Sequence, residues 1–131
     1  MQAVLSENEQ FRAEAAQRDL ERLQGAWGYV TGRREARLVV TGNAFAMRFA
    51  NGEAYSGTFT LDPTCRPREM DLVIDEGREG HRGKQAQAIY QFDGDHLIWA
   101  TGEPGNGQRP DAFPHEPGGD YLCIIFRRDP A

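Results

Sequence analysis

The sequence lacks the marks of several common protein classes. No stretch approaches the ~18 consecutive apolar residues of a membrane-spanning helix, so we expect no membrane partner. The N-terminal residues show no basic segment followed by an apolar one, so no secretory signal is visible and a cytoplasmic protein is expected. The formal net charge is −5, whereas nucleic-acid-binding domains normally carry a basic stripe, so nucleic acid is not an expected partner.

Cysteine is scarce, and recognisable chemical motifs are missing. Cys65 and Cys123 lie far apart without metal-ligand or redox spacing. Free thiols are therefore the default, although a disulfide between a loop and the last strand is left open. There is no Gly-x-Ser-x-Gly, Walker or dinucleotide motif, and the carboxylates show neither calcium-loop spacing nor an acid/base partner. We therefore predict no enzyme activity, no metal and no cofactor.

The polar residues of the turns are expected to be solvated. Three histidines lie in or beside turns: His81, His96 and His115. Only His96 falls in an expected strand, where its alternation with the neighbouring apolar residues turns it outward. Several arginines cluster in one short connection: Arg33, Arg34 and Arg37. An acidic residue interrupts this cluster, so it reads as an exposed hairpin end and the histidines read as surface residues.

A charged helical segment opens the chain and ends before a glycine. Ser6 and Glu9 form a capping-box pattern. Apolar residues then recur at helical spacing: Phe11, Ala15, Ala16, Leu20 and Leu23. Gly25 is a natural stop. The pattern predicts an amphipathic helix within residues 1–24, whose apolar stripe packs as a lid on the rest of the chain or joins two copies as a homo-oligomer.

Short alternating segments fill the remainder. They are residues 26–31, 36–41, 44–50, 53–61, 69–75, 85–92, 95–101 and 121–128. The dipeptides Asn51-Gly52 and Asp93-Gly94 predict type I′ hairpin turns. Short hairpin connections exclude a βαβ layout, and closing the sheet removes its edges. The prediction is an all-β fold, an eight-stranded antiparallel up-and-down barrel over residues 25–131 with an N-terminal α-helix.

The residues expected to face the barrel interior are large and mostly apolar. They are Trp27, Tyr29, Leu38, Val40, Phe45, Met47, Phe49, Tyr55, Phe59, Met70, Leu72, Ile74, Ala88, Tyr90, Phe92, Leu97, Trp99, Ile124 and Phe126. This set suits a pocket for a small apolar or aromatic ligand, and it suits a filled core equally well. In the pocket reading, the ligand-binding candidates are Tyr29, Phe45, Met47, Tyr55, Phe59, Tyr90 and Trp99.

Residues 102–120 form a long connection with four prolines and five glycines. Irregular loops of this length are usually functional or mobile. This loop and the helix stripe therefore support an alternative function, a protein-interaction or regulatory module built on a filled barrel.

Several motifs together resemble one family. Gly25-x-Trp27 resembles the signature that opens the first strand of lipocalins and other calycins. Further matches are Thr58-x-Thr60-Leu61-Asp62-Pro63-Thr64, Met70-Asp71-Leu72, Ile89-Tyr90-x-x-Asp93-Gly94-Asp95-x-Leu97 and Arg109-Pro110-x-x-Phe113. From Leu23 to Arg128 the chain is similar to a family of uncharacterised bacterial lipocalin-like domains, which supplies a fold and no established activity.

The resemblance assigns structural roles to the ends of the barrel. It implies that Gly25 and Trp27 close one end and that an arginine of the last strand lies across the tryptophan. Alternation with the apolar residues of that strand makes Arg128 the candidate, and Arg127 replaces it if a bulge shifts the register. Family members commonly carry a longer insertion where only residues 32–35 stand here, so a lid over the opposite end is not expected. The expected function is non-covalent binding of a small hydrophobic ligand.

Overall fold

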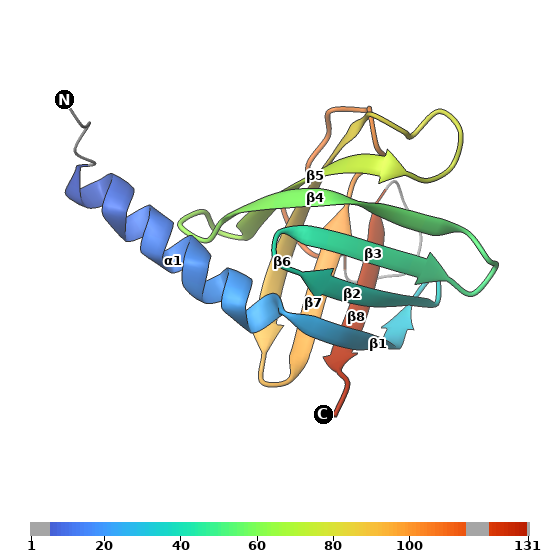
Figure 1. Cartoon of the computed structure of the whole chain (residues 1–131), viewed down its shortest axis with the longest axis horizontal. Helices are drawn as coiled ribbons and strands as arrows, with labels where there is room; N and C mark the ends of the chain where they lie inside the picture. Colours follow the sequence, from blue (N-terminus) through green and yellow to red (C-terminus); the bar gives the residue numbers. More distant parts are fainter. Residues whose placement is uncertain (1–5, 115–120, 131) are drawn as a thin grey trace.

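A computed structural model describes residues 6–114 and 121–130 as one helix followed by a closed sheet (Figure 1). The elements are α1 (Glu7–Leu23), β1 (Gly25–Gly32), β2 (Ala36–Thr41), β3 (Ala44–Phe49), β4 (Ala54–Asp62), β5 (Arg68–Glu76), β6 (Gln85–Asp93), β7 (His96–Thr101) and β8 (Leu122–Arg128). Each strand pairs antiparallel with the next, and β8 pairs with β1. The predicted eight-stranded up-and-down barrel with an N-terminal helix is confirmed.

The interior of the barrel follows the alternation of the strands. In β2 and β3 every second residue is buried. Every residue expected to face inward is either buried or packed against the buried cluster. Burying each large apolar side chain stabilises the fold by roughly 1.5–3 kcal/mol. The inward-facing residues therefore provide much of the driving force that closes the sheet.

Trp27 closes the end of the barrel next to α1. Its side chain is 1% exposed, and its indole Nε1–H donates to the Leu23 carbonyl at 2.9 Å. Arg128 lies over the ring, 4.3 Å from its centroid, and donates to the Gln24 carbonyl at 2.6 Å. Gly25 turns the chain between helix and strand with a φ of 111°. Trp27 and Arg128 therefore bind carbonyl groups that the end of a helix leaves without intrahelical partners.

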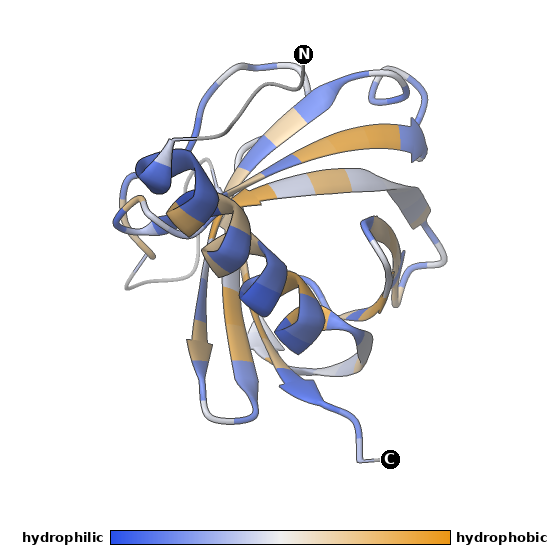
Figure 2. Cartoon of the chain, turned by 60° about the vertical axis from the view of Figure 1, so that its left-hand side comes forward, coloured by the Kyte–Doolittle hydropathy of each residue, from blue (hydrophilic) through white to orange (hydrophobic). Residues whose placement is uncertain are grey.

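Only the C-terminal part of α1 packs on the barrel. Ser6 caps the helix by accepting from the Glu9 N–H at 3.2 Å, as predicted. Leu23 is fully buried, whereas Phe11 is 60% exposed. The first turns project away from the sheet, and most of the helix surface is hydrophilic (Figures 1 and 2). Among the described residues, no helix is long and apolar enough to cross a membrane.

A buried polar contact fixes the angle at which α1 leaves the barrel. The hydroxyl of Tyr90 on β6 donates to the Asp19 carboxylate at 2.7 Å. Arg68 on β5 pairs with the same carboxylate at 3.3 Å. Burial, followed by the bond to Asp19, raises the pKa of Tyr90 well above its ordinary value. The phenol of Tyr90 and the carboxylate of Asp19 therefore hold the helix and two strands together.

The hairpin turns differ from the predicted type. A type I′ turn needs positive φ at both central residues, and no described non-glycine residue has one. At Asn51-Gly52 only the glycine has positive φ, and the Gly52 N–H donates to the Phe49 carbonyl at 3.0 Å. The second turn is centred on Gly94–Asp95, one residue later than predicted. Within residues 6–114 and 121–130, glycine alone has a positive φ, because other residues are disfavoured in the left-handed region by about 1–2 kcal/mol.

Residues 102–114 pack on the outer face of β5 and β6. Arg109 donates to one backbone carbonyl of each strand, at 3.2 and 2.8 Å, and its guanidinium also pairs with Asp71. Pro110 is fully buried beside it. This part of the predicted long loop is held against the barrel, and residues 115–120 lie outside the described part of the chain.

Candidate functional site

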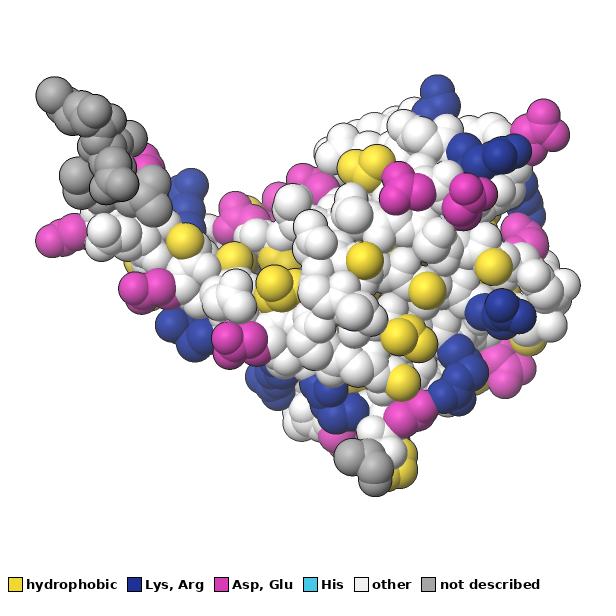
Figure 3. Space-filling view, in the orientation of Figure 1, with side chains coloured by type: hydrophobic (Ala, Val, Ile, Leu, Met, Phe, Trp, Pro, Cys, Tyr) yellow, Lys and Arg dark blue, Asp and Glu magenta, His cyan; other side chains and the backbone are white. Residues whose placement is uncertain are grey.

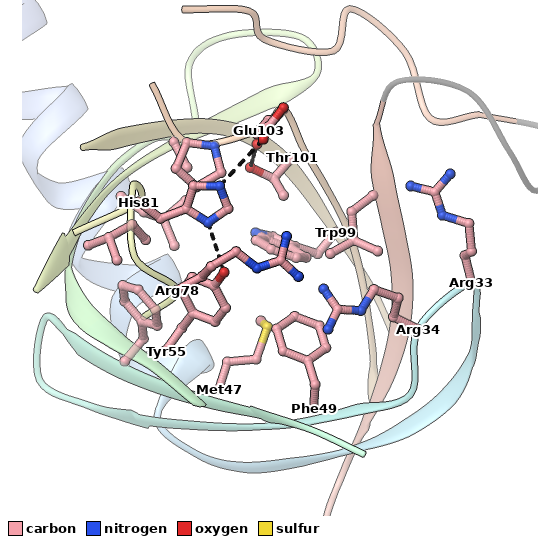
Figure 4. Close-up of a pocket in the computed structure, with 17 residues that line it drawn as sticks. Arg33, Arg34, Met47, Phe49, Tyr55, Arg78, His81, Trp99, Thr101 and Glu103 are labelled. Atoms are coloured by element: carbon pink, nitrogen blue, oxygen red, sulfur yellow. Dashed lines mark hydrogen bonds and ion pairs between the residues drawn. The ribbon is translucent and has the colours of Figure 1, made fainter. Parts of the chain in front are cut away.

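A cavity of about 290 Å³ lies at the end of the barrel away from Trp27 (Figure 4). Its walls come from β3 and β5, from the starts of β4, β6 and β8, from the end of β7, and from the connections that follow β1, β5 and β7. Trp27 stands at the start of β1 and Arg128 at the end of β8, so they occupy the other end. A second, smaller space of about 20 Å³ lies around Phe59, towards the closed end. The cavity therefore belongs to one end alone.

The deeper part of the cavity is apolar. It is lined by Phe45, Met47, Phe49, Leu72, Ile74, Ala86, Trp99 and Leu122. Phe49 also meets Tyr55 edge to face, with ring centroids 5.8 Å apart. The surface that meets a bound molecule is therefore rich in aromatic rings, which pack well against other rings.

The seven predicted ligand-binding residues divide into two groups. Phe45, Met47, Tyr55 and Trp99 line the cavity. Tyr29, Phe59 and Tyr90 do not. The Tyr29 hydroxyl donates to the Gly32 carbonyl at 2.5 Å, Phe59 lies in the filled end, and the Tyr90 hydroxyl meets α1. Alternation places all seven correctly inside, but it carries no information about depth along the barrel.

Tyr55, His81 and Glu103 form a hydrogen-bonded chain across the mouth (Figure 4). Tyr55 Oη lies 2.8 Å from His81 Nδ1, and His81 Nε2 lies 3.4 Å from Glu103 Oε1. The carboxylate accepts only, so a neutral His81 places its proton on Nε2 and accepts from the Tyr55 hydroxyl at Nδ1. The His81 side chain is 14% exposed, so its interpretation as a surface residue is wrong. His96 is partly exposed beside Asp95, and His115 lies outside the described residues.

Arginines also line the mouth. Arg34 and Arg78 both pair with Oε1 of Glu53, at 3.1 and 3.0 Å. The hydrogen bond from Asn51, followed by that from Arg78, holds the pKa of the Glu53 carboxyl below its ordinary value. Arg33 also lines the cavity. Arg33 is exposed, as predicted, whereas Arg34 is half-buried at the mouth, so the prediction of a solvated cluster is wrong for one of its three members.

The third member of that cluster, Arg37, behaves as predicted. Its side chain is 63% exposed and pairs with Asp129 on the outside of the barrel. Arg37 lies outside the cavity because it belongs to β2 and faces outward. Arg33 and Arg34 line the cavity because they follow the end of β1, in the connection to β2.

Gly77 makes the room that Tyr55 occupies. A Cβ atom on Gly77 would lie 2.4 Å from one carbon of the Tyr55 ring and 2.5 Å from another. Real Cβ atoms essentially never approach a neighbour so closely, so any side chain here displaces the ring. The absence of a side chain at this position therefore holds Tyr55 within reach of His81.

The cysteines lie away from the cavity lining and are both free thiols, as expected. Burial raises the pKa of the Cys123 thiol, and burial followed by the bond to Asp62 raises that of Cys65. Raised values favour the less reactive protonated form. Within the described residues, no group of three or more histidine, cysteine, aspartate or glutamate side chains could hold a metal ion.

The cavity offers groups suited to non-covalent binding. Its walls offer aromatic and aliphatic surface, and its rim offers guanidinium donors together with the chain of phenol, imidazole and carboxylate. Comparison of the chain with protein-family models, with curated proteins and with solved structures found no match.

Proposed function

We propose that this chain binds a small, largely apolar molecule without forming a covalent bond, in the cavity at the open end of a lipocalin-like barrel. The observation that carries the proposal is a cavity of about 290 Å³ with an apolar floor in an otherwise filled barrel. Of the two readings left open by the sequence, a filled core describes the closed end and a pocket describes the open end.

The size of the cavity limits the ligand. An apolar cavity of about 150 Å³ is sufficient to bind benzene, and drug-sized ligands need roughly 300–1,000 Å³. At about 290 Å³, this cavity suits a molecule of about two rings. The family resemblance is supported at the level of the fold, by the closed eight-stranded barrel and its N-terminal helix.

The test is calorimetric titration with naphthalene-2-carboxamide, a neutral molecule with two fused rings. We expect saturable binding at one site per chain. Ala86 lines the cavity and is 4% exposed, so Ala86→Leu fills the space from its wall. This variant should lose at least about tenfold in affinity, or 1.4 kcal/mol.

The matched control is Ala46→Leu, because Ala46 is exposed on the outer face of β3. It makes the same chemical change outside the cavity and should bind like the wild type. Absence of saturable binding to the folded wild type, or equal loss in both variants, contradicts the proposal.

A second candidate function is a protein-interaction module that uses α1. Phe11 favours it, because this large apolar side chain is 60% exposed on the projecting part of the helix. On the barrel face seen in Figure 3, hydrophobic side chains are scattered singly among charged ones. Sedimentation equilibrium tests the homo-oligomer version. It predicts an association that Phe11→Ser abolishes, and a monomer at high concentration counts against it.

A further inference from the structure

We propose that the ligand is a planar aromatic acid whose carboxylate is bound by Arg34 and Arg78 while its rings enter the cavity. This inference names the ligand class for the cavity and rests on the proposed function. Both arginines line the mouth of the cavity, and Figure 4 shows their guanidinium groups reaching over it.

Glu53 holds the two guanidinium groups in place. Its Oε1 accepts from Arg34 at 3.1 Å, from Arg78 at 3.0 Å and from the Asn51 side-chain amide at 2.7 Å. A guanidinium carries five N–H donors in a rigid fork, so a single shared oxygen leaves donors on both groups. The planar fork matches a carboxylate with two parallel hydrogen bonds. The pair is therefore positioned in advance for an anionic group.

The charge at the rim favours an anion. The carboxylate of Glu53 balances one of the two guanidinium charges that it holds. Glu103 is the other acid at the mouth, but its side chain is 68% exposed and faces His81. The Arg34 side chain is only 32% exposed, so water screens its attraction for an anion less effectively than it screens the repulsion from Glu103. On a chain with a net charge of −5, this rim is a local positive site.

The surface below the arginines favours an aromatic body. The guanidinium of Arg34 lies 3.8 Å from the centroid of the Phe49 ring, which leads directly into the apolar floor. Phe45, Tyr55 and Trp99 add three more rings to the lining. A flat molecule with an acid at one end can therefore meet the arginines and the rings at once. The volume limits it to about two fused rings.

The test compares two probes that differ only in their polar group, a charged carboxylate in one and a neutral carboxamide in the other. Naphthalene-2-carboxylate and naphthalene-2-carboxamide have the same rings, and at about pH 8 the acid is ionised. Hydrogen bonds to a charged group predict a preference for the carboxylate of roughly tenfold to hundredfold in calorimetric titration. Its affinity should fall with added salt, whereas that of the carboxamide should not.

Variants locate the preference. Arg78→Gln, in an exposed connection, should reduce the ratio of carboxylate to carboxamide affinity at least about fivefold, and Arg34→Gln should act in the same direction. Arg37→Gln removes the same charge from the outside of β2 and should keep the wild-type ratio. Circular dichroism checks that each variant folds. If Arg34→Gln does not fold, two measurements decide the result: the affinity ratio of Arg78→Gln and the salt dependence of carboxylate binding by the wild type.

Each outcome separates this inference from the proposed function. Equal affinity for the two probes overturns the acid and leaves an apolar ligand in place. Binding of neither probe overturns both. Tighter binding of octanoate than of naphthalene-2-carboxylate overturns the aromatic body. A preference that Arg37→Gln reduces as much as Arg78→Gln also overturns the inference, because the effect then comes from net charge alone.

Discussion

An arginine lies over an aromatic ring at each end of the barrel, but the surroundings of the two pairs differ. At the closed end Arg128 lies 4.3 Å from the centre of the Trp27 ring. At the open end Arg34 lies 3.8 Å from the centre of the Phe49 ring. The second pair stands at the mouth of a cavity of about 290 Å³, whereas neither Arg128 nor Trp27 lines that cavity or the smaller space of about 20 Å³.

The partners of the two arginines explain the difference. Arg128 donates to backbone carbonyls at the end of α1, so the chain itself supplies its acceptors. Arg34 shares one carboxylate oxygen with Arg78, so two cations rely on a single acid. An arginine over an aromatic ring therefore closes the barrel where backbone carbonyls accept its hydrogen bonds. It is a candidate binding group where its acceptor is a carboxylate that it shares with a second arginine.

The largest expected effect separates the ends by stability. Trp27→Ala should cost about 3–5 kcal/mol in the free energy of unfolding, because the ring is enclosed and its N–H caps the helix. Trp99→Ala should cost less, since the cavity already leaves one side of that ring without neighbours. Urea denaturation measures both. A cost for Trp99→Ala that equals or exceeds that for Trp27→Ala breaks the comparison.

A smaller effect concerns the alkaline limit of the closed end. The pKa of Tyr90 is raised by burial and by the bond to Asp19, so its stabilising contribution is complete below the ordinary value of about 10. Above that pH the unfolded chain loses the proton first, and stability falls by about 1.4 kcal/mol per pH unit until the folded pKa is reached. Tyr90→Phe removes this decline. Urea denaturation from about pH 9 to pH 11 should show a steeper loss for the wild type, and parallel curves would contradict the account.

The smallest effect tests the packing at the open end. Gly77→Ala should displace the Tyr55 ring and weaken its hydrogen bond to His81, for a loss of about 1 kcal/mol in stability together with weaker probe binding. Gly28→Ala is the matched control at the closed end, because its Cβ approaches only side-chain ends closely, Asp129 Oδ1 at 3.0 Å and Arg37 Nη1 at 3.7 Å, with the Arg127 carbonyl oxygen at 3.9 Å. Equal losses of probe affinity in the two variants would show that the cavity does not depend on the position of Tyr55.

The fold could be predicted from the sequence because apolar and polar residues alternate along strands with a period of two residues. Side chains alternate between two faces, so a run such as residues 44–49 reveals its buried face directly. The ends of such runs also locate the turns to within a residue. The turn types were wrong because a dipeptide such as Asn51-Gly52 does not reveal that only its glycine takes a positive φ.

The rim of the cavity did not follow from the sequence, because its residues lie in connections without a period. Arg78 and His81 lie in the connection between β5 and β6, and Glu103 follows β7, so closure of the barrel brings two separate segments to one mouth. Their composition resembles that of any solvated turn. The spacing in α1 likewise predicted the helix, but it did not predict that Phe11 projects beyond the barrel.

The most direct measurement uses the two tryptophans, one at each end. In nitrogen-labelled protein, the indole N–H signals of Trp27 and Trp99 are followed by NMR during titration with naphthalene-2-carboxylate. Binding at the open end predicts that the Trp99 signal moves until saturation while the Trp27 signal stays in place, since its N–H is bound to the Leu23 carbonyl. A moving Trp27 signal beside a stationary Trp99 signal, or no movement of either, would contradict a ligand site in the open end.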